Sequence, residues 1–484
     1  MDLSTLTATQ ALEGLAAGDV SSVELLDAQL QRIQKHNPTI NAVVATDLDG
    51  ARQQAEQADN RRSYGQASGS LAGLPMTIKD TFETRGLTTT AGAPPLSDHV
   101  PQTDADVIHA LRQAGAIIFG KTNVPLYAGD HQSFNDVYGI TNNPWDTTRT
   151  PGGSSGGPAA ALACGFTTAE IGSDIGNSIR LPAHFNGLFG LKPTHGVVSL
   201  RGHIPGPPGA LGHPDLAVAG PLARSIDDLG LLLDVITTVA AFRGVPGAAL
   251  PPSPGRPDVA SLRVALWADD AAAPVSRVCR DAVEGVGTTL EEGGATIQPD
   301  LRPAVPTESL HQTYLQLLLP IMAAGLPADA WDGLVQAAGH TEAEAPSAVL
   351  MNAQMMTATH RAWLAADEQR HQARAAWDTL FDQVDVVVMP VAPTPAFPHN
   401  IELPYDQRTT DVDGQQRPYA DILFWAGLAT MPGLPSVAIP TGAVDGLPVG
   451  VQIMGPRYGD LTLLDIARTI AEATDATFTP PPGF

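Results

Sequence analysis

The stretch TPGGSSGG at residues 150–157 and the stretch GSDIGNSIR at residues 172–180 decide how this chain is interpreted. Each places a serine in flexible, glycine-containing backbone, Ser154 in the first and Ser178 in the second. Upstream, the short apolar run GLPMTIKD carries Lys79 near its end. A hydroxyl nucleophile needs a neighbour that takes its proton and donors aimed at the oxyanion that then forms. Two serines and one lysine supply these functions without a histidine.

Lysine is rare in this chain. Among its 27 basic residues only four are lysines: Lys35, Lys79, Lys121 and Lys192. Arginine stays protonated at pH 7, whereas burial lowers the pKa of a lysine and lets it lose its proton. Lys79 is therefore a candidate for the proton acceptor that the serines need. We expect Lys121 and Lys192 to pack their aliphatic stems and to pair with acidic side chains.

The composition limits the possible partners. The 484 residues carry a net charge of −24, and such a field repels the phosphates of nucleic acids and anionic membranes. We therefore expect neither a nucleic acid nor a membrane as a partner. The N-terminus lacks a basic, apolar leader, and the two cysteines form no framework, which predicts a cytoplasmic protein without a signal peptide. The oligomeric state is not readable, and a homodimer is possible.

Predicted helices alternate with short apolar strands, which is typical of an α/β fold. The clearest helices are expected at residues 104–114, 158–164, 227–238, 278–292 and 461–473. The clearest strands are expected at residues 116–119, 166–172, 262–266, 385–390, 436–440 and 449–454. We expect one domain over residues 1–484, with a Pro/Gly-rich surface excursion near 244–258 and a variable helical region near 300–376.

Two motif matches are rejected because their structural context is wrong. The segment GAIIFGKT at residues 115–122 has the spacing of a phosphate-binding loop, but its spacer is itself a predicted strand. GGSSG at residues 152–156 has the spacing of a nucleophile elbow, which requires a strand directly upstream, whereas residues 142–150 are turn-like. The thirteen histidines show no metal-ligand spacing, so we expect no metal.

Taken together, the lysine, the glycine-rich serine and the later serine resemble the amidase signature family in order and spacing. The segment GLKPT at residues 190–194 extends the match, and residues 120–123 and 435–452 resemble the flanking elements of the family. The resemblance covers nearly the whole chain. It implies a single α/β domain with a mixed sheet covered by helices on both faces, and an enzyme that needs no metal or organic cofactor.

The resemblance also assigns roles to particular residues. Ser178 matches the nucleophile, Lys79 the base, and Ser154 the bridging serine, which follows a cis peptide bond in this family. The oxyanion donors are assigned to four consecutive backbone amides: Ile175, Gly176, Asn177 and Ser178.

Three further residues are expected to support the site. Asp174 and Arg180 flank the nucleophile, and we expect an ion pair between them that holds the loop; Ser155 is expected beside the bridging serine. Asn177 stands where the family usually has a glycine, and asparagine tolerates a positive φ better than most residues. Its side chain is expected to narrow the acyl site or to add a donor there.

The predicted function is hydrolysis of a small-molecule carboxylic amide to an acid and ammonia or an amine, through an acyl-enzyme. Two alternatives stay open. One is the glutaminase subunit of a tRNA-dependent amidotransferase, although Leu126 stands where that subunit tends to carry an acid and the net charge of −24 fits tRNA work poorly. The other is a catalytically silent binding protein of the same fold, for which Asn177 is the reason.

The substrate pocket is expected to draw its walls from variable segments. We place them near residues 127–134, 201–213, 314–321 and 424–425, which are mostly apolar and predict an uncharged, moderately hydrophobic amide. Arg201 is the nearest candidate for binding a charged acyl group.

Overall fold

The computed structural model describes residues 2–242, 249–340 and 347–484. The predicted surface excursion near 244–258 lies partly outside these residues, and its described part, 249–258, contains no helix or strand. Within the described part of the chain, no helix is long and apolar enough to cross a membrane.

The main sheet has eight strands in the order β10-β9-β11-β15-β14-β7-β8-β6. Its members are β6 (Glu170–Asp174), β7 (Phe189–Lys192), β8 (Val218–Ala223), β9 (Arg263–Leu266), β10 (Thr296–Gln298), β11 (Val386–Pro390), β14 (Ser436–Val444) and β15 (Leu447–Met454). Strands β10, β9 and β11 are parallel, and the remaining neighbours pair antiparallel. The prediction of a mixed sheet is therefore confirmed.

A second, three-stranded sheet has the order β1-β3-β2, with β1 (Val43–Thr46), β2 (Pro75–Lys79) and β3 (Ile117–Thr122). Its edge strand β2 lies beside β6 of the main sheet. The N–H of Thr77 donates to the hydroxyl of Thr167, and the hydroxyl of Thr77 donates to the carboxylate of Glu170. This contact brings Lys79, at the end of β2, to the end of β6. Two short hairpins complete the strands: β4 (Phe134–Asn135) with β5 (Gly139–Ile140), and β12 (Thr409–Val412) with β13 (Gln415–Pro418).

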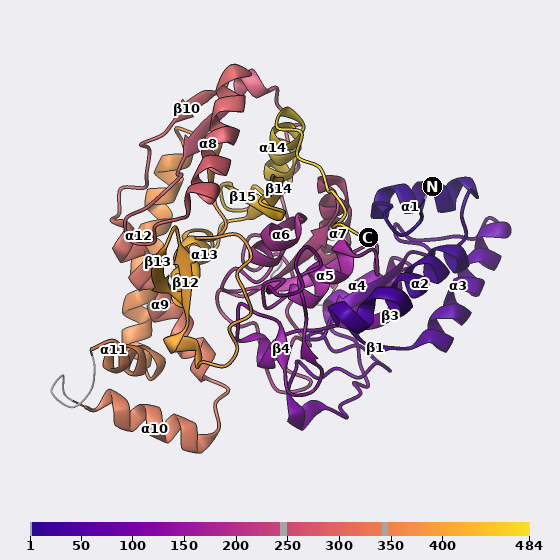
Figure 1. The fold of residues 1–484 in the computed structure, drawn as a ribbon, viewed down its shortest axis with the longest axis horizontal. Coiled ribbons are helices and arrows are strands. Elements are labelled where there is room, and N and C mark those ends of the chain that lie inside the picture. Colours follow the sequence, from indigo (N-terminus) through magenta and orange to yellow (C-terminus); the bar gives the residue numbers. More distant parts are fainter. Residues whose placement is uncertain (1, 243–248, 341–346) are drawn as a thin grey trace.

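Helices cover both faces of the main sheet (Figure 1). One layer consists of α1 (Ala8–Ala17), α4 (Asp106–Gln113), α7 (Ile226–Phe242), α8 (Arg277–Glu292) and α14 (Asp460–Ala473). The opposite layer consists of α5 (Gly156–Ala163), α6 (Arg180–Asn186), α9 (Thr307–Ala323), α12 (His360–Phe381) and α13 (Ile422–Thr430). The remaining helices are α2 (Ser22–Ile40), α3 (Leu48–Ser63), α10 (Ala328–Ala338) and α11 (Ser347–Met356).

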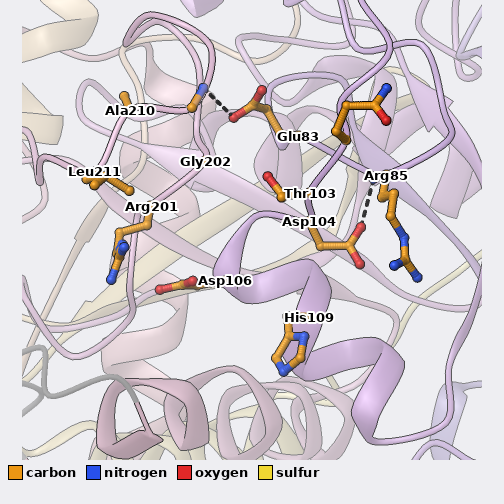
Figure 2. Close-up of a pocket in the computed structure, with 12 residues that line it drawn as sticks. Glu83, Arg85, Thr103, Asp104, Asp106, His109, Arg201, Gly202, Ala210 and Leu211 are labelled. Carbon is orange, nitrogen blue, oxygen red and sulfur yellow. Dashed lines mark hydrogen bonds between the residues drawn. The ribbon is translucent and has the colours of Figure 1, made fainter.

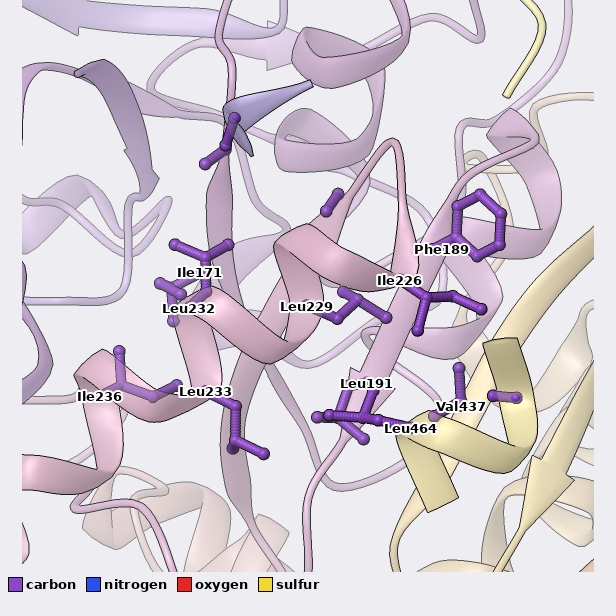
Figure 3. Close-up of a cluster of buried hydrophobic side chains, with 14 of the residues drawn as sticks. Ile171, Phe189, Leu191, Ile226, Leu229, Leu232, Leu233, Ile236, Val437 and Leu464 are labelled. Atoms are coloured by element: carbon purple, nitrogen blue, oxygen red, sulfur yellow. The ribbon is translucent and has the colours of Figure 1, made fainter. Parts of the chain in front are cut away.

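Strand β11 shows why both faces must be covered. Val386 and Val388 belong to the core under the first layer of helices, whereas Val387 and Met389 belong to the core under the second. All four side chains are buried, since successive residues of a strand point to opposite faces. Figure 3 shows the first core, in which Leu229 and Leu232 of α7 lie over Leu191 of the sheet.

Local signals predicted several element ends. Thr7 caps α1 and Ser21 caps α2, each with the reciprocal side-chain contact of a capping box. The predicted helical region near 300–376 is confirmed by helices α9 to α12.

Other boundaries were wrong. The first helix begins at Ala8 rather than at residue 4, and the strand expected at 166–172 runs from Glu170 to Asp174. That shift places Ser173 and Asp174 on the strand itself. Strand β11 was expected to be of the parallel type, yet it pairs antiparallel with β15 on one side.

Candidate active site

Lys79 lies at the end of β2, and its side chain is fully buried. Its Nζ atom is 2.7 Å from Oγ of Ser154, 2.9 Å from Oγ of Ser155 and 2.9 Å from Oγ of Ser173. The amine is therefore surrounded by three neutral hydroxyls.

Burial lowers the pKa of Lys79 to about 7, although the carboxylates of Asp174 and Glu170 act in the opposite direction. Burial also raises the pKa of Glu170 to about 8, so this carboxyl is mostly protonated at neutral pH. Lys79 is thus close to half neutral at pH 7, as a general base must be.

Ser154 lies in the turn before α5, and the peptide bond between Gly153 and Ser154 is cis. The glycines here are required by close approach of other backbone. A Cβ atom on Gly153 would lie 2.6 Å from the carbonyl oxygen of Asp130, and one on Gly157 would lie 2.3 Å from that of Asn123. The glycine-rich stretch is therefore wedged against two neighbouring segments and is not a linker.

Ser178 follows β6 and precedes α6. Its carbonyl oxygen accepts the N–H of Ser155 at 3.2 Å, which ties the two serine-containing loops together. Ser178 is 6% exposed and Ser154 is 1% exposed. Of the two serines, Ser178 is the one that a substrate reaches more easily.

Asp174 and Arg180 form the ion pair that the sequence predicted. The guanidinium of Arg180 contacts both carboxylate oxygens at 3.0 Å, and both side chains are fully buried. Burial alone would raise the pKa of Asp174, but Arg180, Lys192 and hydrogen bonds hold this pKa at about 2. The carboxylate therefore stays ionised and organises the loop between β6 and α6.

One predicted oxyanion donor is already occupied. The N–H of Asn177 donates to Asp174 at 2.9 Å, because residue 177 has a φ of 82° and turns this amide towards the carboxylate. The amides of Ile175, Gly176 and Ser178 have no acceptor within the described part of the chain. Three of the four predicted amides are thus available.

The expectation for the side chain of Asn177 was also wrong. Its Nδ2 atom donates to the carbonyl oxygen of Val391 at 2.7 Å, and the residue is fully buried. The side chain therefore fixes the loop to the segment after β11 and is not a donor towards a substrate.

Three side chains from distant segments surround Gly176. A Cβ atom at Gly176 would lie 3.0 Å from Leu423, 3.5 Å from the hydroxyl of Tyr314 and 3.9 Å from Cε1 of His131. The hydroxyl of Tyr314 donates to the carbonyl oxygen of Ile175 at 2.7 Å. Nδ1 of His131 is buried without a hydrogen-bond partner. Two of the predicted wall segments, 127–134 and 314–321, thus reach the candidate nucleophile loop.

The other predicted wall residues lie elsewhere. Arg201 lines a cavity of about 400 Å³ together with Glu83 and Asp106, as Figure 2 shows. The indole N–H of Trp425 donates to the carbonyl oxygen of Ala273 inside the core, so Trp425 is a structural residue.

The two further buried lysines also differ from expectation. Nζ of Lys121 donates to the carbonyl oxygen of Phe82, and Nζ of Lys192 donates to that of Pro193. Both side chains donate to backbone oxygens where carboxylates were expected. Across the described ranges, no group of three or more His, Cys, Asp or Glu side chains is placed to hold a metal ion.

Sequence reasoning missed Ser173 and His203. Nε2 of His203 lies 2.9 Å from Oγ of Ser173, which in turn contacts Lys79. The position of Ser173 directly before Asp174 was a usable signal once the strand end is placed correctly. His203 gave none, because it lies in a Pro/Gly-rich loop far from the serine stretches.

Comparison with known proteins agrees with this geometry. The family model described as Amidase matches residues 24–464. A subunit of the glutamyl-tRNA(Gln) amidotransferase from Chloroflexus aggregans is 33% identical over 509 residues, covering 98% of this chain and 97% of the relative.

Solved structures are similar over nearly the full length. A crystal structure of an amidase superposes with a TM-score of 0.78 at 28% identity, covering 97% of this chain and 99% of the other. The structure of 6-aminohexanoate cyclic dimer hydrolase superposes with a TM-score of 0.78 at 26% identity, covering 100% and 99%. Fold and family thus define a hydrolase type that acts on carbon–nitrogen bonds. The chain belongs to the amidase signature family.

Proposed function

We propose that this protein is an amidase whose catalytic groups are Lys79, Ser154 and Ser178. The observation that carries the proposal is the contact of 2.7 Å between the buried amine of Lys79 and the hydroxyl of Ser154. Burial lowers the pKa of this amine to about 7, so it can accept a proton at neutral pH.

The chemistry follows from these positions. Neutral Lys79 takes the proton of Ser154 while Ser154 takes that of Ser178, and Oγ of Ser178 bonds to the amide carbon. The amides of Ile175, Gly176 and Ser178 stabilise the resulting oxyanion. Ser154 then gives its proton to the leaving nitrogen, the carbon–nitrogen bond breaks, and an acyl-enzyme remains. Water attacks that ester along the same proton path and releases the acid.

The walls around Gly176 favour an uncharged amide with an apolar acyl group. Leu423, Tyr314 and His131 are the side chains nearest to Gly176, and burial lowers the pKa of His131 to about 4, which keeps its ring neutral at pH 7. A substrate that carries an ammonium or a carboxylate would have to leave water for this surface without an opposite charge.

The second candidate is the glutamine-hydrolysing subunit of a tRNA-dependent amidotransferase. It is favoured by the full-length similarity to relatives that are named as subunits of glutamyl-tRNA(Gln) amidotransferases. Glutamine carries both an α-ammonium and an α-carboxylate, which the neutral walls around Gly176 do not match. Such a subunit would also need a protein partner.

Two measurements on the purified chain test these proposals. The first is labelling with a serine-directed fluorophosphonate, with the adduct mapped by mass spectrometry. An adduct on Ser178 supports the mechanism, an adduct on Ser154 contradicts it, and no adduct on folded protein favours a silent binding protein. The second compares neutral p-nitroanilides of increasing acyl length with L-glutamine. Turnover of glutamine alone, or only with a co-purified subunit, would replace the first candidate by the second.

A further inference from the structure

His203 lies two hydrogen bonds away from the amine of Lys79. Its Nε2 atom is 2.9 Å from Oγ of Ser173, and that oxygen is 2.9 Å from Nζ of Lys79. All three side chains are buried, His203 being 8% exposed. The contact therefore acts inside the protein, where misdirected hydrogen bonds are expensive.

The loop that carries His203 is fixed against the chain directly after Lys79. The N–H of Ile204 donates to the carbonyl oxygen of Thr81 at 2.8 Å. The imidazole packs edge-on against the ring of Phe82, with 4.9 Å between the ring centroids. The imidazole is thus held in one place relative to the lysine.

Counting hydrogen bonds shows what such a histidine does. A neutral amine has two N–H donors and one lone pair, and Lys79 faces three hydroxyls. The lone pair must face the O–H of Ser154 for proton transfer, so Ser155 and Ser173 must accept the two N–H groups. Each of these hydroxyls then needs another acceptor for its own proton. Ser155 has the carbonyl oxygen of Ser173 at 3.4 Å, and Ser173 has Nε2 of His203.

The neutral state of the imidazole is essential to this arrangement, because a protonated ring donates from both nitrogens. The charged groups that face His203 are Lys79 on β2 and Lys121 on β3. Burial and these two cations lower the pKa of His203 to about 3. The ring therefore stays neutral across the pH range in which Lys79 titrates.

We propose that His203 is a positioning residue of the amidase reaction: it accepts the proton of Ser173 and thereby directs the lone pair of Lys79 towards Ser154. Without this acceptor, the hydroxyl of Ser173 turns to the lone pair of Lys79 and competes with Ser154 for it. This inference rests on the proposed function, since it requires Lys79 to act as a base.

Two substitutions of the histidine test the proposal. His203→Leu keeps the apolar bulk and removes the acceptor, whereas His203→Gln keeps an acceptor oxygen at a similar distance along the side chain. With a neutral p-nitroanilide, we expect His203→Leu to lower kcat about tenfold at every pH from 5 to 9, with KM changed less than about threefold. We expect His203→Gln to restore kcat to within about threefold of the parent enzyme. Arg201→Gln is the matched control on the same loop and should leave kcat unchanged.

The pH profile separates positioning from general damage. Because His203 does not titrate in this range, the inflection of kcat in His203→Leu should stay where it is in the parent, with only the plateau lowered. A kcat of His203→Leu within twofold of the parent, or a His203→Gln variant as slow as His203→Leu, would overturn the proposal. If His203→Leu does not fold, Ser173→Ala and Ser173→Thr replace the pair, and only the threonine variant should keep activity.

Failure of the wider proposal looks different. If Lys79→Met keeps full activity, the proposed mechanism is wrong as a whole. If Lys79→Met is inactive while both His203 variants are fully active, the mechanism stands and only the role of His203 is wrong.

Discussion

The protonation of Lys79 should govern the reactivity of Ser178 towards a fluorophosphonate. Burial lowers the pKa of Lys79 to about 7, so the neutral fraction is about half at pH 7 and about 1% at pH 5. A lysine at its ordinary pKa of 10.5 would be neutral in only about one molecule in 3,000 at pH 7. Because neutral Lys79 is the base, the labelling rate should rise about tenfold for each pH unit below pH 6 and level off above pH 8.

The assay measures the second-order rate of adduct formation on Ser178 at pH 5 to 9, and needs no knowledge of the substrate. Lys79→Met retains the length and bulk of the side chain and should lower the plateau by about 10²–10⁴-fold. Circular dichroism of each sample checks that the fold persists. A rate that does not change between pH 5 and pH 8, or a Lys79→Met rate within tenfold of the parent, would refute this reasoning.

Other substitutions give independent tests. Ser178→Ala should lower amide turnover by about 10⁴-fold or more and Ser154→Ala by about 10²–10⁴-fold, both without loss of thermal stability. Asp174→Asn should lower the free energy of unfolding by about 3–5 kcal/mol, because it leaves Arg180 buried without its countercharge; denaturant titration measures this. The pKa of Asp174 is lowered to about 2 in the folded protein, so its contribution to stability is present above its ordinary pKa and is lost as the pH falls towards about 2. Asn177→Gly should cost about 1 kcal/mol of stability and keep activity, whereas Asn177→Ala adds strain of about 1–2 kcal/mol at a φ of 82°; equal stability of the two would contradict this.

Much of the fold could be predicted because its signals are local. The capping boxes at Thr7 and Ser21 involve residues three apart, and helices and strands alternate with clear apolar patterns. The ion pair between Asp174 and Arg180 was also predictable, since six residues separate the two side chains across one turn.

The rest of the site depends on contacts between distant segments. Ser173 and Lys79 meet only because β2 lies beside β6, and no spacing in the sequence encodes that neighbour relation. His203 reaches Ser173 from a loop whose composition predicts only turns. The occupied amide of Asn177 was missed for a different reason: a positive φ says that the amide turns, but not towards which acceptor.

The three hydroxyls around Lys79 explain why this site is built from serines. A buried amine needs hydrogen-bond partners, yet a carboxylate in any of their positions would form an ion pair and keep the lysine protonated. Neutral hydroxyls satisfy the amine without opposing the effect of burial on its pKa. Asp174 and Glu170 do act against burial, but Arg180 neutralises the first and protonation the second. A catalytic lysine can therefore work at neutral pH in a chain with a net charge of −24, because the charges nearest to it are paired or titrated away.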